Sequence, residues 1–318
     1  MNEKDKAAKG SSEEGESKAN NNKKSPLVHG MAGAIAGAGS TAITHPLDLI
    51  KTRFQVLQQY GGGLKKRKLL DAFRSIARSE GVRSLYKGLT PNLLGSSVAW
   101  GLYFNFYNLH KTGIEKYFMK PLSPSDHIVA ASCAGAITAV FTNPVWLLKT
   151  RMQLQVEKDV GARKYRNILH AVWKISVEEG PLTFFRGLGP ALYLVPHGAF
   201  QFVAYEYLRK VALQKDEQTL GPTRAFVAGV VSKIFAQLLT YPYQVVRAHM
   251  QQAPTPDQVK TLSTTDVALR LFKRGGVAEL YRGLFPSLLR VAPASALTFV
   301  IYEQSTRIIP YLLTNLPS

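Results

Sequence analysis

Cysteine is almost absent from this chain, since Cys133 is the only one among 318 residues. A single cysteine excludes an intramolecular disulfide framework and a metal site built on cysteine ligands. The sequence also lacks a Gly-x-Gly-x-x-Gly pattern, a P-loop lysine, clustered metal ligands and a plausible catalytic triad. We therefore predict a protein that is not an enzyme and that needs neither a metal nor a cofactor.

Acidic residues are scarce, with 21 Asp and Glu against 40 Lys and Arg and a net charge of +19. This excess suggests either a nucleic-acid surface or contact with anionic lipids and solutes. Residues 1–25 hold 6 lysines, 5 acids and almost no apolar residues. They are expected to form a disordered tail that is neither a secretory signal nor an amphipathic presequence. Any targeting information would then be internal.

Charge is unevenly distributed despite a mean hydropathy of −0.06. Six segments are long enough to cross a bilayer, which takes about 20 residues, and their interiors carry at most one charged residue each. We predict two membrane spans in each third of the chain, and the alternative is six buried helices of a soluble bundle. The segments are residues 27–48, 89–110, 128–148, 188–205, 225–246 with Lys233, and 284–301 with Arg290.

Three near-copies of one motif begin at prolines spaced 98 residues apart, Pro46, Pro144 and Pro242. They read PLDLIKTRFQ, PVWLLKTRMQ and PYQVVRAHMQ, and a fixed long period indicates three copies of one unit. A second motif places an aromatic residue and a base before Gly88, Gly187 and Gly283, with a proline three residues later. Proline suits the first turn of a helix, so the even-numbered spans should start there. These positions could bind anionic lipid or simply cap the helices.

The connecting loops differ in charge on the two sides of the predicted membrane. Three loops carry 10, 8 and 6 basic residues, whereas two on the opposite side carry 3 and 4. The basic side should face the compartment of synthesis, or the matrix of an imported organellar protein. Each basic loop is predicted to contain a short amphipathic helix, exemplified by Leu70, Phe73, Ile76 and Ala77, although an ordinary solvated loop is the alternative. The basic loops are residues 51–90, 149–188 and 247–284, and the others are 111–126 and 206–224.

The threefold motifs make the chain resemble the mitochondrial carrier family over residues 27–313. The resemblance implies an all-α membrane protein of three tandem repeats, with six transmembrane helices in a pseudo-threefold barrel and three short matrix helices. It also implies transport by alternating access across the mitochondrial inner membrane, with both termini toward the intermembrane space. The expected divisions are a tail at 1–25 and repeats 1, 2 and 3 at 26–121, 122–221 and 222–318.

In the family, the motif prolines kink the odd-numbered helices, and the acid after each proline pairs with a base of the next repeat to close a matrix gate. Only Asp48 keeps its acid here, and its expected partner is Lys149. Trp146 and Gln244 replace the other two acids, which leaves Arg247 and Lys51 without carboxylates, so this gate should open more easily. The resemblance also assigns bracing glutamines at Gln55, Gln153 and Gln251, and an incomplete cytosolic gate at Asn108, Lys111, Glu206, Arg209 and Glu303.

Positions where the repeats differ are the candidates for substrate contact. Lys233 stands where repeats 1 and 2 have glycine, and an ionisable group within a span is a functional candidate. Counting seven residues from the second-motif glycines gives Gly95, Leu194 and Arg290, which match the family's contact points. Two cations favour an anionic substrate, although either could instead pair with a carbonyl or a glutamine. Val195, Trp100, Tyr103, His197 and Gln201 complete the candidate set.

The segment around Trp100, Tyr103 and Phe104 could stack a flat ring, or could only pack as a helical stripe. With the flanking Ala99 and Gly101, it makes the chain look most like the folate and FAD carriers of the family. We predict transport of FAD or a related flavin or folate, with NAD or pyrimidine-nucleotide transport as the alternative. A soluble basic nucleic-acid-binding protein is the rival from another class. The expected partners are the substrate and membrane lipids including cardiolipin, with no nucleic acid, for a monomeric carrier.

Overall fold

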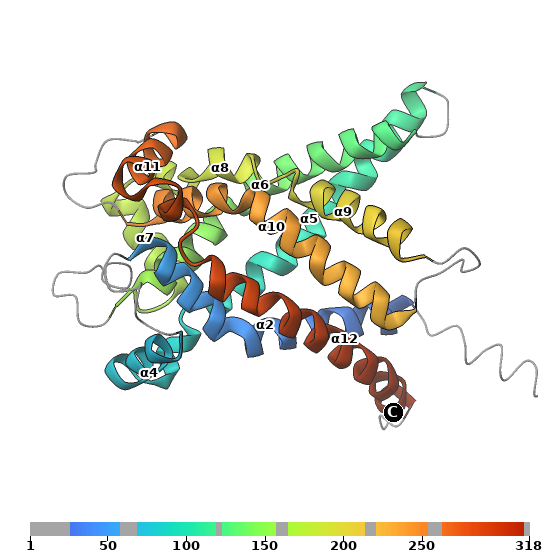
Figure 1. Cartoon of the computed structure of the whole chain (residues 1–318), viewed down its shortest axis with the longest axis horizontal. Helices are drawn as coiled ribbons and strands as arrows, with labels where there is room; N and C mark the ends of the chain where they lie inside the picture. Colours follow the sequence, from blue (N-terminus) through green and yellow to red (C-terminus); the bar gives the residue numbers. More distant parts are fainter. Residues whose placement is uncertain are drawn as a thin grey trace, which may run out of the picture. The chain divides into compact units, whose positions relative to one another are not determined.

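The computed structural model of this chain describes residues 26–57, 69–118, 123–156, 165–213, 221–253 and 263–314. Helices make up nearly all of these ranges, which contain no strand, so the all-α prediction is confirmed (Figure 1). The expected tail at 1–25 lies outside the described residues. The chain divides into two compact units, residues 1–40 with 295–318, and residues 41–294.

The odd-numbered spans are single long helices: α2 (Pro26–Val56), α6 (Pro124–Leu154) and α10 (Pro222–Gln251). Each contains its motif proline in the interior. Proline lacks an N–H and crowds the carbonyl four residues earlier, which is the physical basis for a kink. At the start of α6, Ser123 and Asp126 exchange side-chain and backbone hydrogen bonds in a capping box.

The even-numbered spans start one residue after the second-motif glycines, as predicted. They are α5 (Leu89–Phe118), α8 (Leu188–Leu192) continued by α9 (His197–Ala212), and α12 (Leu284–Thr314). Gly88, Gly187 and Gly283 have φ of 83°, 80° and 75°. Only glycine adopts such backbone angles without strain, so these residues fix where each helix begins.

The predicted span at 188–205 is not one continuous helix. Between α8 and α9 the chain forms tight turns, in which the amides of Leu194 and Val195 donate to carbonyls three residues earlier at 3.1 Å each. Pro196 lies four residues after Leu192 and would clash with its carbonyl in a regular α-helix. The helix therefore breaks within this span.

Three short helices follow the odd-numbered spans, as the loop pattern predicted: α4 (Leu69–Glu80), α7 (Ile168–Glu178) and α11 (Thr264–Leu280). In α4, Ala72 and Ile76 are buried and pack with Phe73 and Ala77. Leu70 was wrongly placed on this face, since it is 66% exposed. Leu69 contacts the cluster in its place, because a helix repeats its face every three or four residues.

Three of the described helices are long and apolar enough to cross a membrane by length and composition: Asp126–Leu154, Thr223–Gln251 and Leu284–Tyr311. Of the other predicted spans, α2 and α5 have 31 and 30 residues, and the remaining one is divided between α8 and α9. Of the six predicted membrane segments, three are thus long and apolar enough to cross a membrane among the described residues.

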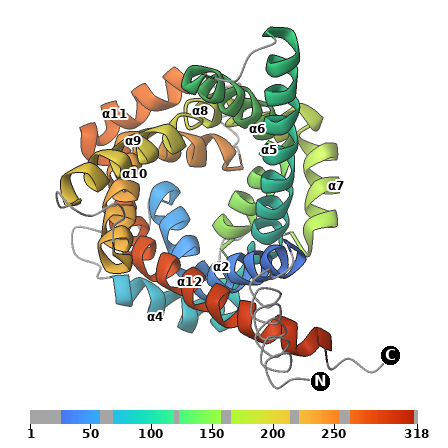
Figure 2. The same ribbon diagram turned by 90° about the vertical axis from the view of Figure 1, so that its right-hand side faces the viewer.

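Within the unit of residues 41–294, α5 packs along α6 and α9 packs along α10 (Figure 2). The smaller unit has its own apolar contact, in which Val28, Ala32 and Ile309 are buried beside Tyr302. His29 Nδ1 also lies 2.8 Å from the Tyr302 hydroxyl. The smaller unit therefore joins segments that are distant in the sequence, whereas the two helix pairs of the larger unit are consecutive along the chain.

Candidate functional site

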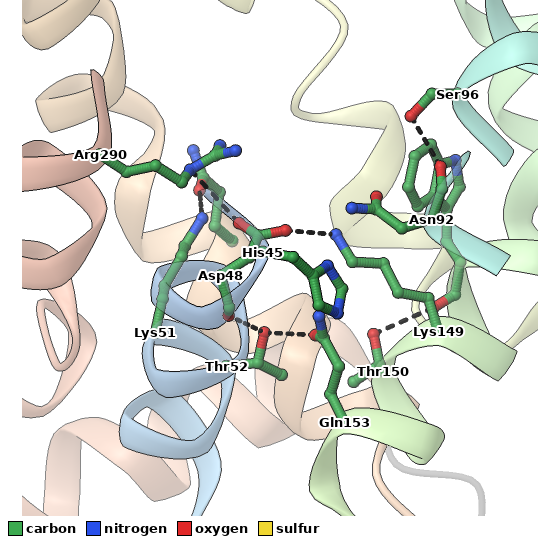
Figure 3. Close-up of polar contacts among 12 residues, drawn as sticks. His45, Asp48, Lys51, Thr52, Asn92, Ser96, Lys149, Thr150, Gln153 and Arg290 are labelled. Carbon is green, nitrogen blue, oxygen red and sulfur yellow. Dashed lines mark hydrogen bonds and ion pairs between the residues drawn. The ribbon is translucent and has the colours of Figure 1, made fainter. Parts of the chain in front are cut away.

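The first contact of the site is the one expected between Asp48 and Lys149. The Lys149 ammonium donates to Asp48 Oδ2 at 2.8 Å (Figure 3). Asp48 lies two residues after the proline of α2, and Lys149 lies five residues after the proline of α6. The side chains are 9% and 17% exposed, so the ion pair is largely shielded from solvent. It joins repeats 1 and 2.

Arg290 approaches the other oxygen of the same carboxylate. Its Nε lies 3.3 Å from Asp48 Oδ1, which is ion-pair distance. Nε makes no hydrogen bond in the described part of the chain, so this contact is electrostatic and the N–H remains unsatisfied. Asp48 thus faces cations from both of the other repeats.

The two motif positions that lack an acid, Gln244 and Trp146, make different contacts. Lys51 donates to Gln244 Oε1 at 3.1 Å and lies 5.9 Å from the centre of the Tyr241 ring. The Lys149 ammonium lies over Trp146, 5.4 Å from the centre of the indole ring. Arg247 makes no ion pair among the described residues, and its buried Nε has no partner there. Glutamine therefore replaces one charge pair with a hydrogen bond, whereas Trp146 makes a cation–π contact with Lys149 of its own helix and leaves Arg247 without an ion pair among the described residues.

The expected bracing glutamines all contact a neighbouring repeat. Thr52 donates to Gln153 Oε1 at 2.7 Å, Thr150 donates to Gln251 Oε1 at 2.8 Å, and Gln55 donates to the Tyr241 hydroxyl at 3.1 Å. A Cβ on each second-motif glycine would press on the same glutamines: Gly88 on Gln153 and Gly187 on Gln251 at 2.9 Å, and Gly283 on Gln55 at 3.2 Å. The glycines therefore allow the repeats to approach closely.

The residue before each motif proline makes an equivalent contact in all three repeats, although its type differs. Each side chain donates to the backbone carbonyl of the base that precedes a second-motif glycine. These contacts could not be predicted from the sequence, because no residue type recurs at the three positions. The distances are 3.1 Å for His45 to Lys87, 3.1 Å for Asn143 to Arg186, and 3.0 Å for Tyr241 to Arg282.

A second set of missed residues ties the short helices to the spans. Arg53 is fully buried and donates from Nη1 and Nη2 to Glu80 at 2.5 and 2.9 Å. Arg151 binds Glu179 in the same way, at 2.6 and 2.8 Å. Burial alone would raise the pKa of Glu80, but hydrogen bonds and charge from Arg53 and Lys87 hold it below its ordinary value. The recurring arginine seven residues after the proline, with a later Glu-Gly, was the available signal.

Two of the predicted contact positions face neighbouring helices. A Cβ on Gly95 would lie 3.1 Å from Val145 and 3.7 Å from the Trp146 ring, and a Cβ on Gly135 would lie 3.1 Å from Val195. Leu194 is half-buried in the break between α8 and α9. Of the three aligned positions, Arg290 is thus the one that presents a charged group to Asp48.

The remaining candidates lie on α5, α9 and α10. His197 Nδ1 lies 2.9 Å from the Thr240 hydroxyl, whereas Gln201 and Lys233 are half-buried. Trp100 is 62% exposed. Its ring stacks on Phe104 at 5.6 Å and meets Tyr103 edge-on at 6.2 Å. All three rings lie on α5 and contact one another, which fits both a stacking site and ordinary packing along the helix.

The predicted cytosolic-gate charges pair along their own helices. Lys111 lies 4.0 Å from Glu115, Arg209 lies 3.6 Å from Glu206, and Arg307 lies 2.5 Å from Glu303. Asn108, which replaces an acid, is exposed. Pairs spaced three or four residues apart are typical of helix surfaces.

Three helical repeats with long apolar helices and a shielded inter-repeat charge network define a membrane protein of the transporter type. The family described as mitochondrial carrier protein matches residues 22–118, 120–216 and 218–311. The chain belongs to the mitochondrial carrier family, whose members are transporters rather than enzymes and need no cofactor. The nucleic-acid-binding alternative is therefore set aside.

Similar proteins include transporters from two organisms. Folate transporter 1, chloroplastic, of Arabidopsis thaliana is 40% identical over 293 residues, covering 87% of this chain and 94% of the relative. Nicotinamide adenine dinucleotide transporter 1, chloroplastic, of the same plant is 36% identical and covers 93% and 96%. Mitochondrial nicotinamide adenine dinucleotide transporter 1 of Saccharomyces cerevisiae is 32% identical and covers 88% and 76%.

Proposed function

We propose that this carrier moves an anionic solute with a flat ring, FAD or a related flavin or folate, across the mitochondrial inner membrane. The observation that carries the proposal is the excess of cations around one carboxylate. Asp48 faces Lys149 and Arg290, and Lys51 has only an uncharged glutamine as its hydrogen-bond partner among the described residues. An anionic substrate group would balance this excess, and the arginine fork suits phosphate or carboxylate.

The flat-ring part of the proposal rests on two tryptophans. The Trp146 ring centre lies 5.4 Å from the Lys149 ammonium, and Trp100 is largely exposed on α5. The names of the relatives include folate and nicotinamide adenine dinucleotide, which support solutes that combine a ring system with negative charge. NAD or a pyrimidine nucleotide is the alternative substrate, and the NAD transporters among the relatives favour it equally.

We further propose that Asp48, Lys149, Lys51 and Gln244, with Trp146 and Arg247, form the matrix gate, and that the residues near Glu206 and Glu303 form the cytosolic gate. In this arrangement both termini face the intermembrane space, and cardiolipin binds near Gly88, Gly187 and Gly283. The carrier is expected to act as a monomer of three repeats with the bounds given above. Since relatives carry both mitochondrial and chloroplastic names, the membrane of residence should be checked by fractionation of the producing cell.

The test is uptake by sealed liposomes that contain the purified carrier. Radiolabelled FAD, folate, NAD and a pyrimidine nucleotide are supplied separately, and protein-free liposomes give the background. FAD or folate should enter fastest, and Arg290→Ala should abolish uptake without changing insertion. Arg270→Ala is the matched control, because that arginine is exposed on α11 and belongs to neither proposed gate. Uptake of none of these solutes, or of NAD alone, would contradict the first choice.

A further inference from the structure

Asp48 contacts two cations, Lys149 and Arg290, in different ways. Its Oδ2 accepts a hydrogen bond from Lys149 at 2.8 Å, whereas its Oδ1 only lies near Arg290 Nε at 3.3 Å (Figure 3). The carboxylate is 9% exposed and Arg290 is 34% exposed. One acid is therefore held firmly by repeat 2 and loosely by repeat 3.

Arg290 is poorly satisfied by this arrangement. Its Nε is buried and makes no hydrogen bond to any described residue. Leaving a buried charged donor unpaired is costly, and a charge-assisted hydrogen bond would relieve that cost. The partial exposure of the side chain means that a solute anion can reach it.

We propose that Asp48 is a built-in substitute for the substrate's anion: it neutralises Arg290 in the empty carrier, and a phosphate or carboxylate of the solute replaces it. This inference rests on the proposed function, because it requires an anionic substrate. Displacement leaves Asp48 paired with Lys149, so the contact between repeats 1 and 2 persists while the charge contact to repeat 3 is lost. The same carboxylate thus connects substrate binding to the inter-repeat network.

Competition with Asp48 also sets the class of solute. A neutral molecule cannot replace a carboxylate on a guanidinium, because it would leave Arg290 without a counter-charge. A flat ring alone is therefore insufficient, and at least one full negative group is required. Riboflavin, which carries the flavin ring without the phosphates of FAD, is the matched neutral probe.

The experiment measures the affinity of the purified carrier in detergent for FAD, folate, NAD and riboflavin. Asp48→Asn should bind the anionic solute that the wild type binds up to about fivefold more tightly, which is the range for losing a partly shielded competing charge. Lys149→Met also breaks the gate pair, but it should not tighten binding, because Asp48 then remains free to hold Arg290. Equal tightening in both variants would mean that gate loosening, not competition, controls affinity.

A double-mutant cycle separates direct competition from a general change in cavity charge. Asp48→Asn should give no gain in an Arg290→Gln background and should keep its gain in a Lys233→Gln background. A gain that persists without Arg290 would overturn the proposal. If Asp48→Asn does not fold, Asp48→Lys with Lys149→Asp keeps the ion pair but moves the carboxylate to α6, and unchanged or weaker binding would contradict competition.

The outcomes also separate this inference from the proposed function. If the wild type binds none of the three anionic solutes, the proposed function fails and the inference falls with it. If the wild type binds one of them but Asp48→Asn binds it equally well, the function stands and the competition is wrong. Wild-type binding of riboflavin as tight as that of FAD would likewise contradict the requirement for a negative group.

Discussion

Repeats 1 and 2 attach their short helices to the spans by the same buried ion pair, whereas repeat 3 does not. Arg53 binds Glu80 and Arg151 binds Glu179, with every side chain at most 4% exposed. In repeat 3 the position seven residues after the proline is His249, and the acid's position is Gly275. Both partners are replaced together, and Glu279 and Arg282 instead pair three residues apart.

This comparison shows which features the threefold repeat requires and which it does not. Two contacts recur in all three repeats. One is the close packing of a second-motif glycine against a bracing glutamine, and the other is the hydrogen bond from the residue before the motif proline. They determine how closely the repeats approach one another. The charge pairs vary from repeat to repeat, so charge is where the three copies have diverged.

The largest predicted effect comes from breaking the ion pair of repeat 1. Arg53→Met leaves Glu80 buried without its bidentate partner, and we expect a loss of about 3–5 kcal/mol in the free energy of unfolding. Thermal unfolding in detergent measures it. The pKa of Glu80 is lowered in the folded state, so the pair contributes fully above about pH 4.3, the ordinary pKa of glutamate. This contribution is lost as the pH falls through the folded-state pKa.

The control for that prediction is Lys111→Met, at an exposed pair where the side chains are 41% and 44% exposed. It should change stability by no more than about 1 kcal/mol. If Arg53→Met were equally mild, the difference drawn between repeats 1 and 3 would have no energetic content.

A smaller loss is expected from Gly88→Ala. The new Cβ would lie 2.9 Å from Gln153 Cγ and 3.1 Å from the Lys149 carbonyl, at a φ of 83°. Left-handed backbone in a residue other than glycine costs about 1–3 kcal/mol, and the close contacts add to it, so we expect a loss of at least about 2 kcal/mol in thermal unfolding. Gly101→Ala is the matched control: this helical glycine has no atoms within 4 Å of an added Cβ, and alanine should stabilise it by about 0.5–1 kcal/mol. A neutral Gly88→Ala would indicate that the repeats do not need this close approach.

Much of the fold could be predicted from the sequence, because a repeat of equal length places equivalent elements at equal intervals. The helix starts after Gly88, Gly187 and Gly283 followed from that register, and the pairing of Asp48 with Lys149 followed from the resemblance to the carrier family. The break before His197 was not predicted, because repeats 1 and 3 have no proline at the position equivalent to Pro196 when counted from the second-motif glycines. Likewise, spacing locates Gly95 and Val195 along their spans but does not show that the positions pack against neighbouring helices.

The residues before the prolines illustrate a different limit. His45, Asn143 and Tyr241 perform one task with three kinds of side chain. Each can donate a hydrogen bond to a carbonyl, and only the structure shows that the acceptors are equivalent. Symmetry of contact can therefore persist where symmetry of sequence has been lost.

Restoring the missing ion pair tests whether repeat 3 differs only in these two residues. His249→Arg alone should destabilise the protein by about 1 kcal/mol or more, because it buries a charge without a designed partner. Adding Gly275→Glu should recover only part of that loss, because the added Cβ would lie 3.3 Å from the Cβ and Oε2 of Glu279. The two changes should be strongly non-additive in thermal unfolding. If His249→Arg alone is stabilising, the nearby Glu279 supplies the acid, and the repeats differ less than their sequences suggest.

The smallest expected effect concerns the charge pairs of the proposed gate. Gln244→Glu gives Lys51 a carboxylate in place of the amide oxygen that now lies 3.1 Å away. A partly buried ion pair adds about 1 kcal/mol to the state that contains it, so the closed gate should open less often and uptake should slow by up to about fivefold. Gln244→Met, which removes the hydrogen bond without adding charge, should not slow uptake. If both variants transport at the wild-type rate, opening of this network does not limit transport. The loss of the motif acids in repeats 2 and 3 would then not be explained by easier opening of the gate.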